Sequence, residues 1–240
     1  MTNDSRRGGG VLTGVALAAV LVCSPLAAQE LPWMLVVHGN VTTSSQIFPF
    51  INSVDPVVRA QSYEVSAAYA VGGEIRYRFS DAHVAIGLSA DYLNASLSRP
   101  LVTVHNESIP VNDGYTVMPV ELTGYFIIPF SGKVFGVYMG AGGGMYFGER
   151  RLTVGNVASV SGSTSPGGGI HVLAGVSYSP MVRLTFLGEM KFRDVQFNAT
   201  NTFPGTSIVY NGKTIAVTAQ NDSRIYTDGV IFQLGMAFSF

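Results

Sequence analysis

After residue 30 the sequence alternates between large apolar residues and small or polar ones, and this two-residue period recurs along most of the chain. The stretch LTFLGEMKF, residues 184–192, shows the pattern clearly. Successive side chains of a strand point to opposite faces, so the period predicts strands with one apolar face. After the N-terminal segment there is no apolar run of about 18 residues, so no membrane-spanning helix is expected. The chain is therefore predicted to be all-β.

Eight alternating segments are joined by connections of two lengths. The expected strands are 33–42, 63–79, 82–96, 114–130, 133–151, 167–179, 181–198 and 225–240. Turn-forming residues make the short connections, at Ser80–Asp81, Ser131–Gly132–Lys133 and Ser179–Pro180. Long polar connections (43–62, 97–113, 152–166 and 199–224) join the other pairs. This layout predicts an eight-stranded antiparallel up-and-down transmembrane β-barrel, with short periplasmic turns and long extracellular loops.

Two features of the sequence leave the number of strands and the position of Pro119 undecided. Asn211–Gly212 lies between two short alternating arms and predicts a hairpin over 207–217. We expect the hairpin to extend beyond the membrane, with a ten-stranded barrel as the alternative. Pro119 lacks the N–H that a strand ladder needs, so we expect it at the outer rim or at a bulge of its strand.

The N-terminus has the order of a secretory signal. Arg6 and Arg7 precede an apolar run from Val11 to Val22, and small residues lead to Ala28. We expect residues 1–28 to be a cleaved signal peptide and residues 29–240 to form one outer-membrane β-barrel domain. Cleavage removes Cys23, the only cysteine, and with it any disulfide or thiol chemistry.

Composition excludes several classes of function. Charged residues make up 12% of the chain, about half the share in soluble domains, while mean hydropathy is +0.31. A formal net charge of -1 with no basic stripe argues against a nucleic-acid partner. The histidines (His38, His83, His105 and His171) lack the spacing of metal ligands. No metal and no cofactor are expected.

Alternation alone also fits a soluble ligand-binding barrel. Aromatic residues gathered beside the short turns favour a membrane barrel, because such a girdle marks a membrane interface. They are Tyr77, Phe79, Phe130, Phe135, Tyr178, Phe238 and Phe240. Five glycines share one face with Tyr138 and Tyr146, namely Gly136, Gly140, Gly142, Gly144 and Gly148. They would make room for long side chains that arrive from opposite strands inside a narrow barrel.

The charged residues of the strands are expected to face the lumen, because a basic residue facing lipid at mid-membrane costs roughly 2–4 kcal/mol. The predicted lumen network is Glu74, Arg76, Arg78, Asp91, Glu121, Arg183, Glu189, Lys191 and Arg193. An eight-stranded barrel is just wide enough for such side chains to fill. We expect a closed, paired network in a protein with a structural or surface-interaction role. The alternative is a narrow channel for small or apolar solutes.

The chain ends in GVIFQLGMAFSF, an alternating strand whose last residue is aromatic. With the N-terminal signal and the stretches PVELTGYFIIPF and VYMGAGGGMYF, this ending resembles small eight-stranded outer-membrane barrels of the OmpA/OmpX/OmpW type. The resemblance implies an outer-membrane location among outer-membrane lipids. It also implies delivery by periplasmic chaperones and insertion by the barrel assembly machinery. Phe232, Phe238 and Phe240 are then the expected assembly signal.

A monomer is expected, with the loops available to an extracellular ligand. No enzyme is expected, and an outer-membrane hydrolase is a less favoured hypothesis. His83, Ser89 and Asp91 share a face, but His83 and Asp91 are eight residues apart in one strand. That spacing is about 26 Å, too far for a catalytic triad.

Overall fold

The computed structural model describes residues 31–80, 83–102, 108–129 and 134–240. Leu31–Phe240 forms one compact unit. The expected signal peptide, His105, Phe130 and the turn at 131–133 lie outside the described residues. Among the described residues no helix is long and apolar enough to span a membrane.

Strands make up most of the described chain. The helix α1 (Pro56–Arg59) lies between the first two strands. The strands are β1 (Trp33–Phe48), β2 (Tyr63–Arg78), β3 (Val84–Val102), β4 (Ser108–Ile127), β5 (Phe135–Val154), β6 (Val157–Ala158), β7 (Val160–Ser165), β8 (Gly167–Met181), β9 (Leu184–Thr202), β10 (Ser207–Tyr210), β11 (Lys213–Ala216), β12 (Gln220–Tyr226) and β13 (Gly229–Ser239).

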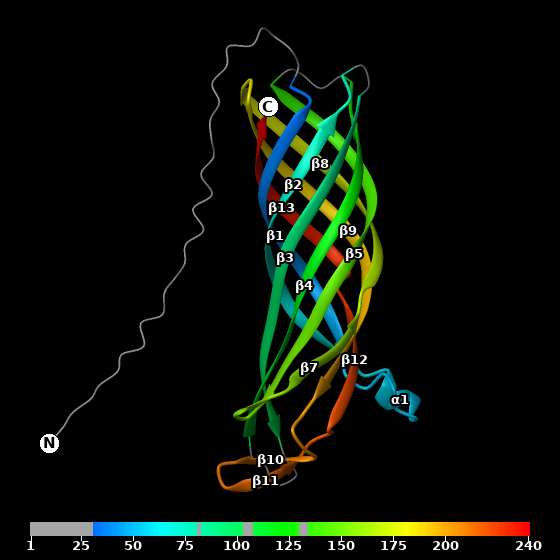
Figure 1. The fold of residues 1–240 in the computed structure, drawn as a ribbon, viewed down its shortest axis with the longest axis vertical. Helices are drawn as coiled ribbons and strands as arrows, with labels where there is room; N and C mark the ends of the chain where they lie inside the picture. The colour runs from blue at the N-terminus through cyan, green and yellow to red at the C-terminus, as the bar shows by residue number, and fades with distance from the viewer. Residues whose placement is uncertain (1–30, 81–82, 103–107, 130–133) are drawn as a thin grey trace, which may run out of the picture. The chain divides into compact units, whose positions relative to one another are not determined.

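Eight strands close into a ring (Figure 1). Each neighbour is antiparallel in the order β1, β2, β3, β4, β5, β8, β9 and β13, and β13 pairs back onto β1. β12 continues the path of β13 outward and pairs with both β9 and β1. The predicted eight-stranded antiparallel barrel is confirmed. β10 and β11 form a separate two-stranded sheet, so the ten-stranded alternative is wrong.

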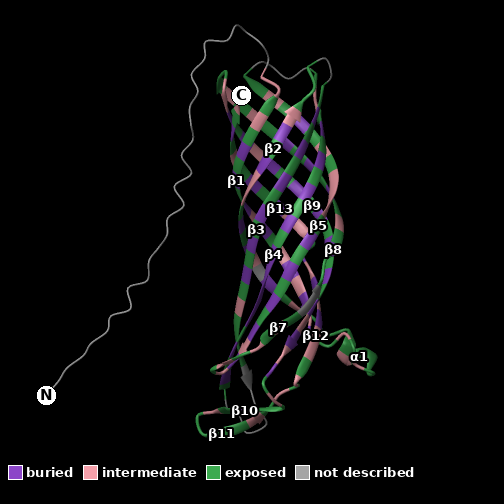
Figure 2. Ribbon diagram, in the orientation of Figure 1, coloured by how far each residue is buried: buried purple, intermediate pink, exposed green. Residues whose placement is uncertain are grey.

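Burial alternates along the barrel strands, with one face turned inward and the other outward (Figure 2). Large apolar side chains on the outward face are exposed in a band that begins beside the short turns. The outermost exposed apolar residues of this band are Tyr69, Tyr92, Met118, Phe147, Ile170, Phe192 and Phe232. An apolar surface around a closed barrel is the surface that lipid requires.

Aromatic rings pack together at the short-turn edge of the band. Trp33 and Tyr77 have ring centroids 4.8 Å apart, and Tyr77 and Phe79 are 5.0 Å apart. Phe135 and Tyr178 form a third pair at 4.8 Å. Aromatic rings at this height match the interfacial girdle expected from the sequence.

At the other end, the strands continue beyond the band into residues expected to be loops. β3 and β4 stay in register from Leu97↔Asp113 to Val102↔Ser108. Inward side chains of β4 and β5 form part of an outer apolar cluster, which packs this end of the barrel without lipid. Its buried members are Ile109, Val111, Leu152, Val154, Phe203 and Ile208.

The turn between β8 and β9 differs from the prediction. It lies at Val182–Arg183, and Ser179–Pro180 belongs to β8, where the register shifts between the Tyr178 and Met181 pairs. A proline near a strand end is tolerated at such an irregularity because the ladder is already broken there.

Pro119 lies inside β4 and produces no bulge. The pairs Ala90↔Val120 and Leu93↔Val117 keep one register on either side of it. Only the two pairs between them are missing, as expected for a residue without an N–H. The bulge alternative is therefore wrong, since the ladder skips the proline and resumes unchanged. The other alternative, the outer rim, agrees with the structure, because Pro119 is next to Met118, the outermost exposed apolar residue of β4.

Candidate functional site

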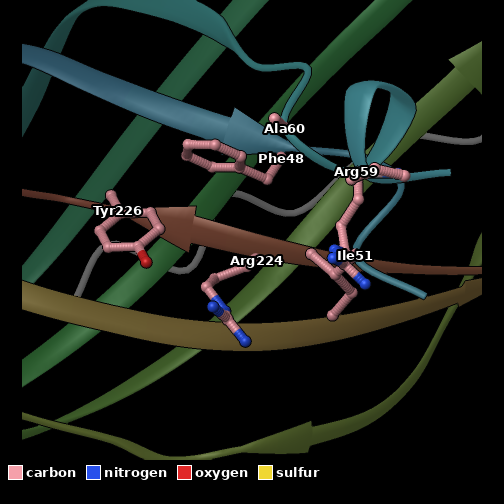
Figure 3. A pocket seen from close by; sticks show the side chains of 7 residues that line it. Phe48, Ile51, Arg59, Ala60, Arg224 and Tyr226 are labelled. Atoms are coloured by element: carbon pink, nitrogen blue, oxygen red, sulfur yellow. The ribbon is translucent and has the colours of Figure 1, made fainter. Parts of the chain in front are cut away.

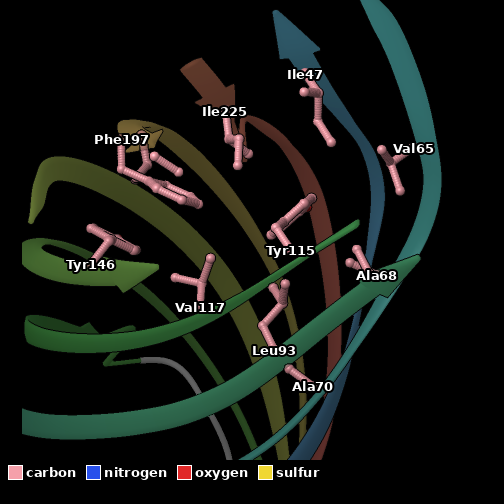
Figure 4. Close-up of a cluster of buried hydrophobic side chains, with 13 residues drawn as sticks. Ile47, Val65, Ala68, Ala70, Leu93, Tyr115, Val117, Tyr146, Phe197 and Ile225 are labelled. Carbon is pink, nitrogen blue, oxygen red and sulfur yellow. The ribbon is translucent and has the colours of Figure 1, made fainter. Parts of the chain in front are cut away.

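The barrel interior is the candidate site, and its side chains lie in layers. An apolar cluster lies toward the short-turn end, formed by Val36, Ala85, Tyr125, Tyr138, Leu173, Leu187 and Ala237. A larger one lies farther along the barrel, where Tyr115, Tyr146 and Phe197 are among thirteen buried apolar side chains (Figure 4). Charged side chains lie between these clusters.

The first charged cluster surrounds Arg76 of β2. Arg76 donates Nε to Glu74 Oε1 at 2.9 Å and NH2 to Glu74 Oε2 at 2.9 Å, a bidentate pair. The same NH2 reaches Glu189 of β9 at 3.1 Å. The guanidinium lies 3.8 Å from the ring centroid of Tyr125, a cation–π contact. Arg76 therefore connects β2 with two strands that are not its neighbours, β4 and β9.

Neutral donors complete this cluster. The Tyr125 hydroxyl donates to Glu74 Oε1 at 2.8 Å, and the Tyr138 hydroxyl donates to Glu189 Oε1 at 2.7 Å. Gln233 Nε2 donates to Glu189 Oε2 at 3.1 Å. Both carboxylates thus accept several hydrogen bonds, as buried charges require.

The second charged cluster surrounds Glu121 of β4, whose side chain is fully buried. Its Oε2 accepts from Lys191 Nζ at 2.8 Å, and its Oε1 accepts from Arg193 NH2 at 3.0 Å. The Tyr146 hydroxyl donates to Oε1 at 2.6 Å. His171 Nδ1 is 3.9 Å away, while its Nε2 lies 2.9 Å from Thr123 Oγ1. One carboxylate thus binds two cations from β9.

The remaining members of the predicted network lie apart from these two clusters. Asp91 Oδ1 is 2.6 Å from His38 Nε2, and both side chains are buried. Arg78 is exposed and Arg183 is half-buried, because Arg78 ends β2 and Arg183 lies in the β8–β9 turn. Among the described residues no ion pair joins either arginine to the network, so their predicted place in it is corrected.

A third charged cluster, which the sequence analysis missed, lies beyond the apolar band. Arg150 of β5 donates Nε to Asp113 Oδ1 at 2.9 Å and NH2 to Asp113 Oδ2 at 2.6 Å. The Tyr63 hydroxyl donates to Asp113 and accepts from Arg150 NH2. Burial alone would lower the pKa of Arg150, but Asp113 raises it above its usual value. Its alternation with Tyr146 was the available signal that Arg150 faces inward.

Glycines give the inward side chains room. A Cβ on Gly148 of β5 would lie 2.4 Å from the Phe197 ring of β9. A Cβ on Gly142 would lie 2.0 Å from the carbonyl oxygen of Leu122 on β4 and 2.9 Å from His171 of β8. The space is taken by the backbone and side chains of adjacent and next-adjacent strands, rather than by side chains from the opposite wall as the sequence suggested.

The described candidates, His38, His83, His171, Ser89 and Asp91, form neither a metal centre nor a triad. Among the described residues no group of three or more His, Cys, Asp or Glu side chains is placed to hold a metal ion. His83 is exposed, whereas Ser89 and Asp91 are buried, and Asp91 is bound to His38.

Comparisons place this architecture among solved structures. No protein-family model and no curated protein matches the sequence. The outer membrane protein OprG from Pseudomonas aeruginosa is similar, with a TM-score of 0.55 and 14% identity over 88% of this chain and 97% of that one. Neisserial surface protein A has a TM-score of 0.43 and 12% identity over 86% and 97% of the two chains.

The identities are low, so the shared property is the fold. The chain has the fold of the small outer-membrane β-barrel proteins. Together with the exposed apolar band, this fold indicates a bacterial outer-membrane location.

Proposed function

We propose that the protein is an outer-membrane barrel with a closed lumen and a structural or surface-interaction role. The supporting observation is the pair of charged clusters around Arg76 and Glu121. Their members come from β2, β4, β5, β9 and β13 and interlock across the interior. Apolar clusters lie on both sides of them. Because these charges are already paired, an ion that enters the lumen would lose its hydration without gaining a free partner.

The surface role is supported by what lies beyond the apolar band. The long ends of β3, β4 and β5, the hairpin β10–β11 and the helix α1 all lie on that side of the barrel (Figure 1). Loops and strand ends carried by a rigid scaffold are the usual place for binding residues. An extracellular ligand of this region remains part of the proposal.

Conductance in planar lipid bilayers tests the closed lumen. The wild-type protein should show no steady single-channel current. Glu121→Ala combined with Lys191→Ala, which removes volume and charge from the second cluster, should raise the frequency of conducting events. The matched control is Glu149→Ala with Arg151→Ala, an exposed pair on the outward face of β5. Steady, saturable current through the wild type would refute a closed lumen.

A narrow channel for small solutes is the second candidate. It is favoured by buried polar atoms on β1 and β13 without a partner among the described residues, namely Asn40 Oδ1, Thr42 Oγ1 and Gln233 Oε1. Such atoms can form hydrogen bonds with water or with a polar solute that moves through the lumen. Wild-type current that falls when Asn40 is changed to Leu would favour the channel.

A further inference from the structure

The segment between β1 and β2 folds back over the outside of the barrel. Asp55 caps α1, accepting a hydrogen bond from Val57 N at 2.8 Å. Asn52 Nδ2 donates to Asp222 Oδ2 of β12 at 2.7 Å, which ties the segment to the wall. The segment is thus held in place although α1 has only four residues.

A pocket of about 510 Å³ lies between this segment and the barrel wall (Figure 3). Phe48 of β1 and Tyr226 of β12 form an aromatic wall, with ring centroids 5.3 Å apart and an edge-to-face angle of 63°. Ile51 and Ala60 of the overlying segment add apolar surface. The volume falls in the range of small-ligand sites.

Two arginines line the same pocket from different elements. Arg59 ends α1, and Arg224 lies on β12 directly opposite Phe48. Among the described residues neither guanidinium takes part in an ion pair. Arg224 donates Nε to Asn198 Oδ1 at 3.3 Å. The nearby carboxylate of Asp222 is engaged by Asn52 and by Thr200 at 2.7 Å. The pocket therefore presents cationic groups next to aromatic rings.

This combination suits a phosphorylated sugar. Guanidinium groups bind phosphate oxygens with paired hydrogen bonds, and both arginines line this one pocket. Phe48 and Tyr226 provide an aromatic surface against which the ring of a sugar can pack. A purely apolar ligand would leave both charges without a partner.

The height of the pocket identifies the source of such a ligand. Arg224 pairs with Asn198 on β9, six residues beyond Phe192, the outermost apolar residue of that strand. Six residues span about 20 Å along a strand, or about 15 Å in height at the usual tilt of 35–45°. That height lies within the saccharide layer of the outer leaflet. We propose that the pocket lined by Arg59, Arg224, Phe48 and Tyr226 binds a phosphorylated sugar of the lipopolysaccharide.

The test measures binding of lipopolysaccharide by the full-length protein isolated from outer membranes and returned to lipid discs. Arg59→Ala and Arg224→Ala should each weaken binding by about tenfold, the loss expected for one charge-assisted contact. Enzymatically dephosphorylated lipopolysaccharide should bind the wild type as weakly as it binds the variants. Arg59 lies in α1, outside the barrel sheet, so Arg59→Ala should fold normally. The test therefore remains valid even if Arg224→Ala fails to fold.

The matched control is Arg151→Ala, which removes an exposed arginine on the outward face of β5, beyond the apolar band. It should leave binding unchanged. Equal losses for Arg151→Ala and Arg59→Ala, or equal binding of the dephosphorylated form, would overturn the proposal. The soluble phosphorylated core oligosaccharide forms a second arm. If the arginine substitutions weaken its binding too, the pocket binds the saccharide itself, as the height of the pocket requires. If they weaken only the binding of intact lipopolysaccharide, the arginines contact phosphates at the membrane surface, and a saccharide site in the pocket is overturned.

Discussion

Glu121 is the residue on which the second charged cluster depends, because no other described carboxylate accepts from both Lys191 and Arg193. Glu121→Ala leaves two buried cations without their carboxylate. Removing one partner of a buried ion pair costs about 3–5 kcal/mol, so the free energy of unfolding should fall by about that amount. Urea unfolding in lipid vesicles measures the change.

Glu149→Ala is the control for this prediction. Glu149 pairs with Arg151 at 3.5 Å, and both side chains are about half exposed. Exposed pairs contribute less than about 1 kcal/mol, so this variant should unfold almost as the wild type does. Equal losses in the two variants would mean that burial does not decide the strength of the Glu121 pairs.

Tyr63 gives the barrel end beyond the membrane a dependence on pH. Burial raises the pKa of its hydroxyl, and the charge of Asp113 adds to this against the opposing charge of Arg150. The folded state therefore keeps a proton that the unfolded chain releases above about pH 10. The stability that this provides is complete below about pH 10 and is lost as pH rises toward the folded pKa.

Comparison with Tyr63→Phe isolates the effect. The variant loses a hydrogen bond to Asp113 at neutral pH but has no hydroxyl to ionise. The drop in unfolding free energy between about pH 8 and about pH 11 should be smaller in the variant than in the wild type. Parallel pH profiles of the two proteins would argue against a shifted pKa at Tyr63.

At the scale of elements, β13 carries the proposed assembly signal. Phe232, Phe238 and Phe240 are all exposed on the outward face, and Phe240 is 55% exposed. Phe240→Ala should lower the fraction of protein assembled in the outer membrane several-fold, because it removes the terminal ring of the proposed signal. Phe126→Ala, which removes an equally outward ring from β4, should assemble normally. Heat-dependent gel mobility of membrane fractions measures the assembled share.

The sequence predicted elements well where lipid imposes the pattern. Within the apolar band the outward residues must be apolar, so alternation is strong and the eight strands could be located. Beyond the band both faces can be polar, and residues such as Ser98 and Asn112 carried no strand signal although they pair in β3 and β4. Asp113 was assigned to a loop for that reason, and its partner Arg150 was therefore missed.

Partners inside the barrel were harder to predict than the inward face itself. Alternation shows that Glu74, Glu121 and Glu189 face inward, but it cannot tell which cation each one meets. Those pairs depend on strand stagger, which sets the relative heights of β4 and β9. The error at Arg183 has a local cause, because Ser179–Pro180 has the composition of a turn but lies within β8.

At the scale of the molecule, the ring of antiparallel pairs should unfold as one unit. Every strand of the ring has two neighbours, and the last pairs with the first, so no edge is left from which the sheet can separate. The protein should need detergent to stay in solution, and unheated samples should migrate differently from boiled ones on gels. A protein that is soluble without detergent and shows a single mobility would contradict a membrane barrel.

The length of β4 has a consequence for what this protein can touch. Its 20 residues span about 66 Å along the strand, which is about 50 Å in height at the usual tilt. The apolar band of such barrels accounts for only about 25 Å of that height. The other half of β4 extends beyond the membrane as part of the barrel wall, where the cluster of Ile109, Leu152 and Phe203 packs its interior. A macromolecule on a neighbouring cell could therefore meet its tip without approaching the lipid at all.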